Sequence, residues 1–190
     1  YIISKLPVNR QSLFFSATLS PKIQTVMSRL LHNPITISIA SNVPTANVEQ
    51  GVIRINGKPK IEVLHEMLVK EDFEKVLIFG RTKFGIEKMS RELIRRGFRA
   101  TSIHGNKSQG ARSAALEAFR RGKVRVLVAT DIAARGIDID DISHVINYEL
   151  PNEPESYVHR IGRTARAGST GVAISFCSSS ERDYLQAIER

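Results

Sequence analysis

Short apolar runs alternate with longer amphipathic stretches along most of the chain. From residue 48 onward the apolar runs predict strands at 48–55, 76–79, 100–103, 124–129, 144–148 and 172–177. The stretches between them predict helices at 60–70, 84–96, 109–121, 155–161 and from about 181. Several strands are apolar at consecutive positions, which is typical of a parallel sheet covered on both faces. The pattern predicts an α/β fold with an open, mostly parallel sheet and helices on both faces.

Residues 1–40 show a shorter version of the same alternation. Two apolar runs, 12–17 and 35–39, predict strands, and a helix is expected from Pro21 with Ser20 as its cap. Two strands and one helix cannot bury a core of their own, so we expect this part to be the end of another domain. It either docks on the domain that follows or pairs with another copy of the chain.

The polar stretch 41–47 is broken by Pro44, which is typical of a linker. The predicted organisation is a β-α-β remnant over 1–40, a linker over 41–47 and a complete domain over 48–190. Because the chain begins at Tyr1 and not at Met, we expect it to be part of a longer polypeptide.

Glycine, hydroxyl and basic residues follow three of the predicted strands. They lie at 80–83, 104–112 and 130–139. Ligands of parallel sheets collect at the carboxyl ends of the strands, where glycine allows close approach and helix N-termini attract phosphate. One such loop alone would be ordinary turn and cap chemistry. The three together predict a track for a nucleic-acid backbone, and with few aromatic residues it should contact phosphate and sugar without reading sequence.

Arg160, Arg163 and Arg166 recur at every third position within 157–168. If that stretch is helical, the arginines lie about 4.5 Å apart along the axis and share one broad face. No acidic residue occurs between positions 155 and 181, so we expect the anion that balances these arginines to come from elsewhere. A guanidinium donates two parallel hydrogen bonds to one phosphate, which favours a phosphate-bearing ligand.

The composition agrees with a polyanionic partner. Lys and Arg number 28 against 19 Asp and Glu, which gives a net charge of +9 and favours nucleic acid over a membrane surface. The lone Cys177 excludes an internal disulfide, fits the reducing cytoplasm and is most simply a buried strand residue. The five scattered histidines argue against a zinc cluster, and no apolar run is long enough to span a bilayer.

The ordered motifs closely resemble those of DEAD-box RNA helicases. Residues 128–139 and 159–166 resemble motifs V and VI, and residues 76–83 resemble motif IV. Residues 104–112, followed by 119–122, resemble the Gln-x-x-Arg region in a form similar to the bacterial RhlE-type branch. Ser16-Ala17-Thr18 is similar to motif III, which closes the first of the family's two RecA-like domains. The resemblance implies that 48–190 is the second RecA-like domain and that 1–40 ends the first.

The resemblance assigns a nucleotide role to six residues. Arg163 and Arg166 would be arginine fingers that reach the γ-phosphate of ATP, and His159 would couple them to the first domain. Asp138 would accept a hydrogen bond from the ATP ribose with Gly136 close by, while Phe79 would pack beneath the arginines.

Other positions would contact RNA or couple the domains. Thr82, Gly105, Gln109, Arg112 and Thr130 would contact RNA phosphates and sugars. Ser16 and Thr18 would couple nucleotide state to strand separation.

Three further expectations concern neighbouring residues. Arg160 would make contacts within its own domain. Asp131 would cap a helix. Ala165 stands where the family usually has glycine, which costs nothing if that position is helical.

The chain lacks the glycine-rich phosphate loop, the Asp-Glu-Ala-Asp motif and the adenine-reading segment of the family. The ligands of Mg²⁺ would therefore lie in the missing first domain, and no metal site is expected here. The resemblance implies the C-terminal half of an ATP-dependent RNA helicase that is inactive alone. Its partners would be RNA and the first domain, and no membrane. Two alternatives remain open, a passive RNA-binding or annealing module and a DNA-directed helicase of the same superfamily.

Overall fold

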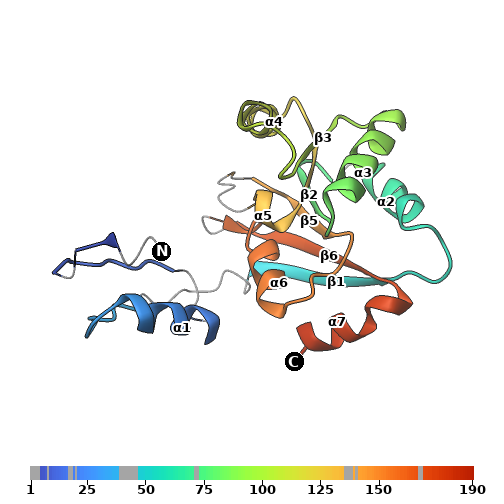
Figure 1. Cartoon of the computed structure of the whole chain (residues 1–190). Coiled ribbons are helices and arrows are strands. Elements are labelled where there is room, and N and C mark those ends of the chain that lie inside the picture. The colour runs from blue at the N-terminus through green and yellow to red at the C-terminus, as the bar shows by residue number, and fades with distance from the viewer. Residues whose placement is uncertain are drawn as a thin grey trace. The chain divides into compact units, whose positions relative to one another are not determined.

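A computed structural model describes residues 5–7, 9–16, 19, 21–38, 47–70, 73–134, 139, 141–166 and 169–190. The chain forms two compact units, Tyr1–Ser41 and Asn42–Arg190, and each is described by itself. Figure 1 labels the helices and strands of both units.

Six parallel strands form one sheet in the larger unit, in the order β1-β6-β5-β2-β4-β3 (Figure 1). The strands are β1 (Val48–Arg54), β2 (Val76–Phe79), β3 (Ala100–Ile103), β4 (Val126–Ala129), β5 (His144–Asn147) and β6 (Gly171–Cys177). Every residue of β2, β4 and β5 is buried, as the consecutive apolar positions predicted for a sheet covered on both faces. The predicted open parallel sheet is confirmed.

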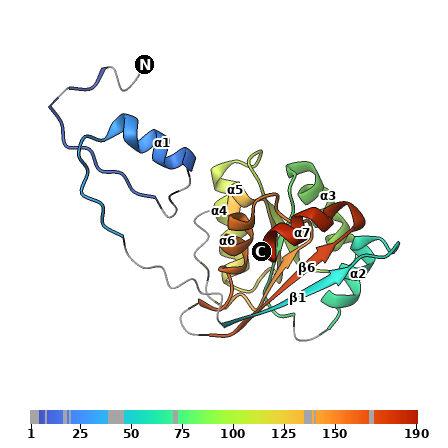
Figure 2. The same ribbon diagram turned by 90° about the horizontal axis from the view of Figure 1, so that it is seen from below.

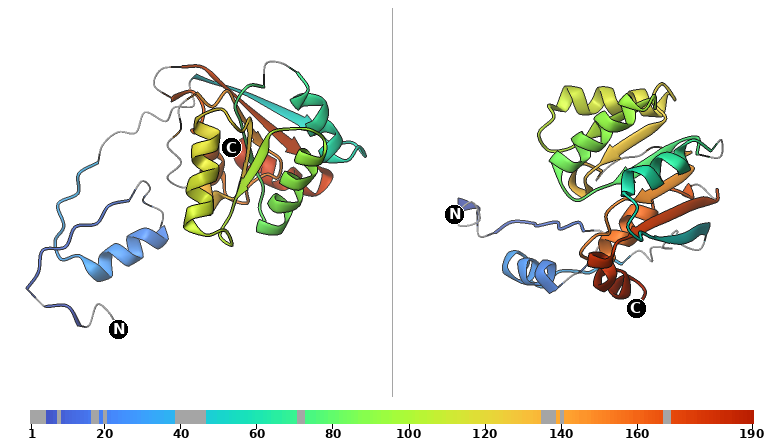
Figure 3. Two further views of the ribbon diagram at one scale, coloured as in Figure 1. Left: turned by 90° about the horizontal axis from the view of Figure 1, so that it is seen from above. Right: turned by 90° about the vertical axis from the view of Figure 1, so that its right-hand side faces the viewer.

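The helices are α2 (Lys60–Leu68), α3 (Lys83–Arg95), α4 (Gln109–Arg120), α5 (Asp131–Ala134), α6 (Pro154–Ile161) and α7 (Arg182–Ile188), which follows the 3₁₀ turn η4 (Ser179–Glu181). They flank the sheet on both sides (Figure 3). Apolar side chains of α2 and α3 pack with Val76 and Ile78 on one face, and those of α4 and α5 pack with Leu77 and Phe79 on the other. The alternation of side chains along β2 therefore divides the core into two layers.

Most predicted elements are confirmed to within two residues. The helix predicted at 155–161 is confirmed as α6, which ends at Ile161 with Gly162 at its C-cap, so the helix does not continue to 168. The short helix α5 was expected only through the cap proposed at Asp131 and not from periodicity, since a single turn after β4 leaves no amphipathic period in the sequence. None of the helices in the described ranges is long and apolar enough to cross a membrane.

Cys177 ends β6 and is buried, as predicted. Its neighbours in a small apolar cluster are Leu150 and Leu185. Figure 2 shows α7 beside β6 and β1 at this end of the sheet.

The smaller unit contains α1 (Pro21–Leu30), which begins where it was predicted. The strands expected at 12–17 and 35–39 are wrong over the described residues 12–16 and 35–38, which form no strand. Phe15 and Ile35 are 88% and 92% exposed. An apolar run becomes a strand only when neighbouring strands take up its backbone hydrogen bonds, and the described residues of this unit supply none. Ser20 lies outside the described residues.

Candidate functional site

Arg160 in the last turn of α6 joins the carboxyl ends of three adjacent strands. Its guanidinium donates to both carboxylate oxygens of Asp131, with Nε–Oδ1 2.6 Å and Nη2–Oδ2 2.8 Å. Nη1 donates to Asn147 Oδ1 at 3.1 Å and to the carbonyl oxygen of Glu149 at 2.7 Å. The guanidinium carbon lies 5.1 Å from the ring centroid of Phe79. Because Phe79 ends β2, Asp131 follows β4 and Asn147 ends β5, one side chain connects all three strand ends.

Asp131 supplies the anion for Arg160, and this ion pair contradicts two predictions made from the sequence. The prediction that all three arginines need an anion from elsewhere is wrong for Arg160, which is only 1% exposed and neutralised within the chain. The prediction that Asp131 caps a helix is wrong as well, because it is the first residue of α5 and its carboxylate faces Arg160. A bidentate pair of this kind fixes the orientation of both side chains.

Arg163 and Arg166 lie beyond the end of α6 and do not share its face. The chain turns at Gly162, where Arg163 donates its backbone N–H to the carbonyl of Arg160 at 3.1 Å. Arg166 Nε donates to the carbonyl of Gly162 at 3.2 Å. The shared face was expected only if residues 157–168 were helical, and that condition is not met because the helix ends between Arg160 and Arg163.

A hollow of about 340 Å³ lies at the carboxyl ends of the central strands. It is lined by Phe79, Asp131, Ala134, Ser156, His159, Arg160 and Arg163. Its floor is Arg160 held by Asp131, and its rim carries the exposed His159 and the half-buried Arg163. The structure thus brings three predicted nucleotide-site residues, Phe79, His159 and Arg163, to one place.

Ala165 departs from the conformation expected for it. Its φ of 55° lies in the left-handed region, so the expectation of a helical position is wrong. A methyl group there costs about 1 kcal/mol relative to glycine. The backbone at Ala165 packs closely against Gly171, because a Cβ on Gly171 would meet the backbone nitrogen of Ala165 at 2.7 Å. Thr164, which is also buried, donates to the carbonyl oxygen of Ile142.

Three helix N-termini line the same edge of the sheet beside this hollow. The helices α3, α4 and α5 follow β2, β3 and β4, which are neighbours in the order β2-β4-β3. The hydroxyl of Thr82 caps α3 by accepting from the backbone N–H of Gly85 at 3.0 Å, and Ser108 caps α4 in the same way. The partial positive charges at the N-termini of α3 and α4 favour an anion at this edge, whereas α5 is a single turn that begins with the acidic Asp131.

Arg112 connects two of these helices. Its Nη1 donates to Gln109 Oε1 and its Nη2 to the carbonyl oxygen of Ala133 in α5, each at 3.4 Å. The Nε of Arg112 is buried and has no hydrogen-bond acceptor. Three predicted RNA contacts, Gln109, Arg112 and the adjoining Thr130 before α5, therefore lie on connected elements. Gly105 is exposed, with nothing within 4 Å of an added Cβ.

Glu87 on α3 supports the loop that follows β3, and sequence reasoning missed it. Its Oε2 accepts from Ser102 Oγ at 2.7 Å and lies 3.2 Å from His104 Nε2 and 3.6 Å from Lys107 Nζ. The hydrogen bond from Ser102 contributes most to lowering the pKa of Glu87 to about 2, and burial opposes it. A carboxylate on a helix rich in lysine and arginine was the only signal in the sequence, and Glu92 on the same helix, which forms ordinary ion pairs with Arg95 and Arg96, has the same signal.

The comparisons with known proteins agree with this geometry. The family model of the helicase conserved C-terminal domain matches residues 59–168. The chain belongs to this family. An ATP-dependent RNA helicase CshA of Listeria monocytogenes is 44% identical over 189 residues, which are 99% of this chain and 36% of that protein.

Two solved DEAD-box structures share the fold. Dbp5 of S. cerevisiae, bound to RNA and ADP BeF3, has a TM-score of 0.84 and 31% identity over 99% of this chain and 50% of that one. A DEAD box protein from the hyperthermophile Methanococcus jannaschii has a TM-score of 0.71 and 38% identity over 100% of this chain and 51% of that one. The predicted RecA-like fold and the resemblance to DEAD-box C-terminal domains are confirmed. The finer likeness to the RhlE-type branch stays a prediction.

This helicase C-terminal domain and its N-terminal extension span about a third to a half of these relatives. Three residues that the family resemblance implicates, Thr18, Gly136 and Asp138, lie outside the described residues. Ser16 lies in the smaller unit and is exposed. No group of three or more His, Cys, Asp or Glu side chains that could hold a metal ion occurs among the residues that the structure describes.

Proposed function

We propose that this chain is the C-terminal half of an ATP-dependent RNA helicase, which locally unwinds RNA duplexes or remodels RNA–protein complexes. The observation that carries the proposal is the position of Arg163 on the rim of a hollow whose floor, Arg160, is fixed by the ends of β2, β4 and β5. A site on a rigid floor can hold an arginine within reach of a substrate that a second domain presents. Relatives that match nearly the whole chain bear the name of ATP-dependent RNA helicases.

On the nucleotide side, Arg163 and Arg166 act as fingers on the γ-phosphate of ATP. Phosphoryl transfer develops charge on the equatorial oxygens, and an arginine finger is worth about 10³–10⁵ in rate. Asp138 accepts from the ribose with Gly136 beside it, and His159 couples the fingers to the first domain. The ATP arrives with Mg²⁺, whose ligands belong to that first domain, so the fragment does not hydrolyse ATP alone.

On the RNA side, Thr82, Gly105, Gln109, Arg112 and Thr130 contact phosphates and sugars. Two features of the edge support this role, the N-termini of α3 and α4 and the buried Arg112 Nε that has no acceptor. Contacts of this kind position a strand without reading its sequence. Binding should therefore be similar for unrelated RNA sequences and weaken with salt.

The cycle requires both halves of the intact protein. Residues 1–40 end the first RecA-like domain, 41–47 link it to the second over 48–190, and Ser16 and Thr18 of the first half sense the nucleotide. Closure on ATP and RNA bends the bound strand out of its duplex, and hydrolysis reopens the two domains. The lone Cys177 fits a reducing compartment, which favours a cytoplasmic location for this protein.

The test joins the chain to the upstream first domain of its own polypeptide and measures ATP hydrolysis with and without single-stranded RNA. We expect hydrolysis that RNA stimulates and that matched DNA stimulates much less, because the 2′-hydroxyl is available to a backbone reader. Hydrolysis that ignores nucleic acid would contradict the proposal and favour a passive RNA-binding module. Equal stimulation by DNA would favour the DNA-directed alternative.

A further inference from the structure

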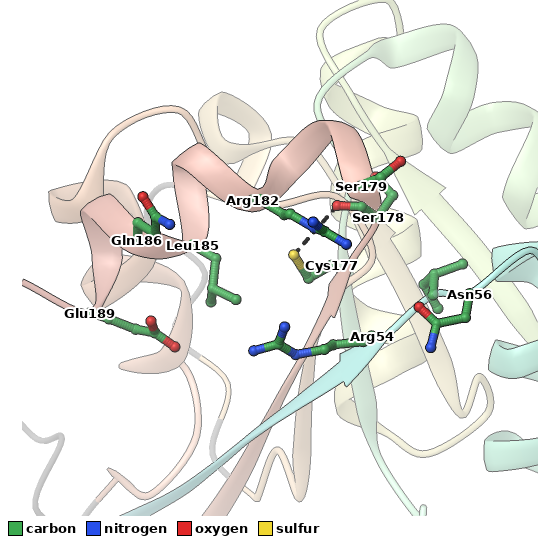
Figure 4. Close-up of a pocket in the computed structure, with 10 residues that line it drawn as sticks. Arg54, Asn56, Cys177, Ser178, Ser179, Arg182, Leu185, Gln186 and Glu189 are labelled. Atoms are coloured by element: carbon green, nitrogen blue, oxygen red, sulfur yellow. Dashed lines mark hydrogen bonds between the residues drawn. The ribbon is translucent and has the colours of Figure 1, made fainter.

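A second hollow, of about 180 Å³, lies at the carboxyl ends of β1 and β6 and is closed on one side by α7 (Figure 4). Its basic and polar lining consists of Arg54, Asn56, Ser178, Ser179, Arg182 and Gln186. Ile55, Cys177 and Leu185 add apolar surface, and Glu189 contributes one carboxylate. None of these residues belongs to the hollow at Arg163.

The wall of this second hollow is held rigidly by Glu181, which is 2% exposed. Its carboxylate accepts from Lys60 Nζ at 2.6 Å and from the backbone N–H of Leu150 at 3.1 Å. It also accepts from the backbone N–H of Ser178 at 3.0 Å and from the Ser178 hydroxyl at 2.6 Å, which completes a capping box. Burial acts to raise the pKa of Glu181, but the hydrogen bonds from Lys60 and Ser178 outweigh it and lower the pKa. The turn that presents Ser179 and Arg182 is thus fixed before any ligand arrives.

Two arginines in the lining of this hollow carry positive charge that the hollow does not fully neutralise. Lys60 and Glu181 neutralise each other across 2.6 Å, so Arg54 and Arg182 face only Glu189 inside the hollow. Within the described residues, neither arginine side chain makes a hydrogen bond or an ion pair, whereas Arg96 and Arg121 are paired with carboxylates.

Arg54 and Arg182 both lie close enough to Cys177 to lower the pKa of its thiol. Burial raises the pKa of the Cys177 thiol and Glu181 adds to that rise, while Arg54 and Arg182 both oppose it. Figure 4 shows Arg54 entering from β1 and Arg182 from the start of α7, with Cys177 between them. Two guanidinium groups beside one cavity, with hydroxyl donors next to them, form a binding site for a phosphate group.

We propose that this hollow is a second phosphate-binding site of the domain, separate from the site for the ATP γ-phosphate. Its ligand is the phosphate of an RNA strand or that of a free mononucleotide. Arg81 connects the proposed RNA edge with this hollow. It follows β2 at the RNA edge, and its guanidinium carbon lies 5.7 Å from the ring centroid of Tyr184 in α7, the helix beside the hollow.

The experiment titrates the 190-residue chain with inorganic phosphate, with adenosine monophosphate and with single-stranded RNA of ten nucleotides, at constant ionic strength. Binding is followed through the amide NMR signals of 178–182 and through the reaction rate of the only cysteine, Cys177, with a thiol reagent. We expect all three probes to shift these amides and to slow the thiol, because bound phosphate covers Cys177 and opposes its ionisation.

Charge variants make the assignment specific. Arg54→Gln and Arg182→Gln should each weaken phosphate binding about tenfold, which corresponds to about 1.4 kcal/mol. Glu189→Gln removes a carboxylate that repels phosphate and should strengthen phosphate binding about threefold. The three variants therefore test both a loss and a gain of phosphate affinity. Arg95→Gln is the matched control, because it removes one exposed positive charge on α3 and should change nothing.

If RNA saturates the shifts of the 178–182 amides at far lower concentration than adenosine monophosphate, and Arg54→Gln and Arg182→Gln abolish that difference, a strand is the source of the phosphate. If both saturate these shifts at equal concentration, the source is a mononucleotide. Either result supports the site. The proposal is overturned if none of the probes shifts the amides of 178–182, or if both arginine variants bind phosphate as the unchanged chain does. Neither outcome would touch the helicase assignment, which depends on Arg163 and is tested by hydrolysis in the joined protein.

Discussion

Arg160 and Arg163 stand three residues apart in one basic motif, yet their surroundings differ in nearly every respect. Arg160 is 1% exposed and donates to Asp131, Asn147 and the Glu149 carbonyl while it stacks on Phe79. Arg163 is half-buried on the rim of the hollow, in the turn that follows Gly162.

The difference shows how one repeated residue type can serve two purposes. The end of α6 at Ile161 separates the two arginines, so the first points into the sheet edge and the second lies at the hollow. The buried arginine makes a rigid base, and the arginine after it can then be placed accurately for a substrate. Mutations should therefore divide cleanly into losses of stability and losses of activity.

The largest expected effect is on catalysis in the protein joined to its first domain. Arg163→Ala should lower kcat for ATP hydrolysis about 10³-fold, because a finger acts on charge that develops in the transition state. The free energy of unfolding should fall by less than it does for a buried arginine such as Arg160, because Arg163 is only half-buried. Steady-state hydrolysis and urea denaturation measure the two quantities on the same sample.

The next effect is on stability. Arg160→Met should lower the free energy of unfolding by about 3 kcal/mol, because removal of one partner leaves Asp131 and Asn147 without the charge that holds them. Asp131 is partly exposed, which keeps the loss at the lower end of the range for buried pairs. Urea denaturation of the isolated chain tests this, with Arg95→Met as a control on an exposed arginine. A loss no larger than that of the control would mean that Arg160 is not the base of the site.

A gain of stability is expected at Ala165. Ala165→Gly should raise the free energy of unfolding by about 1 kcal/mol, because glycine adopts a φ of 55° without steric cost. Thermal unfolding of the two proteins gives the difference. An unchanged or lower midpoint would show that the turn after α6 is not strained by its methyl group.

The smallest effect concerns the RNA edge. The folded pKa of Glu87 is about 2 against an ordinary value of 4.5, so its contribution to stability is present above about pH 4.5 and is lost as the pH falls toward 2. Glu87→Gln should therefore cost less than about 1 kcal/mol at pH 7, and the cost should disappear at low pH. Denaturation at several pH values tests this, and a cost independent of pH would show that the charge of Glu87 is not what matters.

The sequence predicted the sheet well because each strand carries its own signal. Val76–Phe79 is apolar at every position and becomes a fully buried strand, and Thr82 and Ser108 were recognisable as helix-capping residue types. Such signals depend on neighbours within a few residues.

Features that depend on distant partners were not predictable. Nothing near Arg160 in the chain indicates Asp131, which comes from another strand end, and nothing near Glu87 indicates Ser102. The positive φ of Ala165 occurs where the turn packs closely against Gly171, which is six residues further along the chain. The runs at 12–16 and 35–38 carry strand signals, but the described residues offer them no neighbouring strand.

The most direct test of the central claim measures two affinities of the joined protein in the presence of RNA. One is its affinity for ADP alone. The other is its affinity for the complex of ADP and beryllium fluoride, in which beryllium fluoride imitates the γ-phosphate. The unchanged protein and Arg95→Ala should prefer the beryllium fluoride complex by at least about tenfold, or about 1.4 kcal/mol. Arg163→Ala should lose that preference while it binds ADP normally. If Arg163→Ala keeps the full preference, Arg163 does not reach the γ-phosphate and the account of this site is wrong.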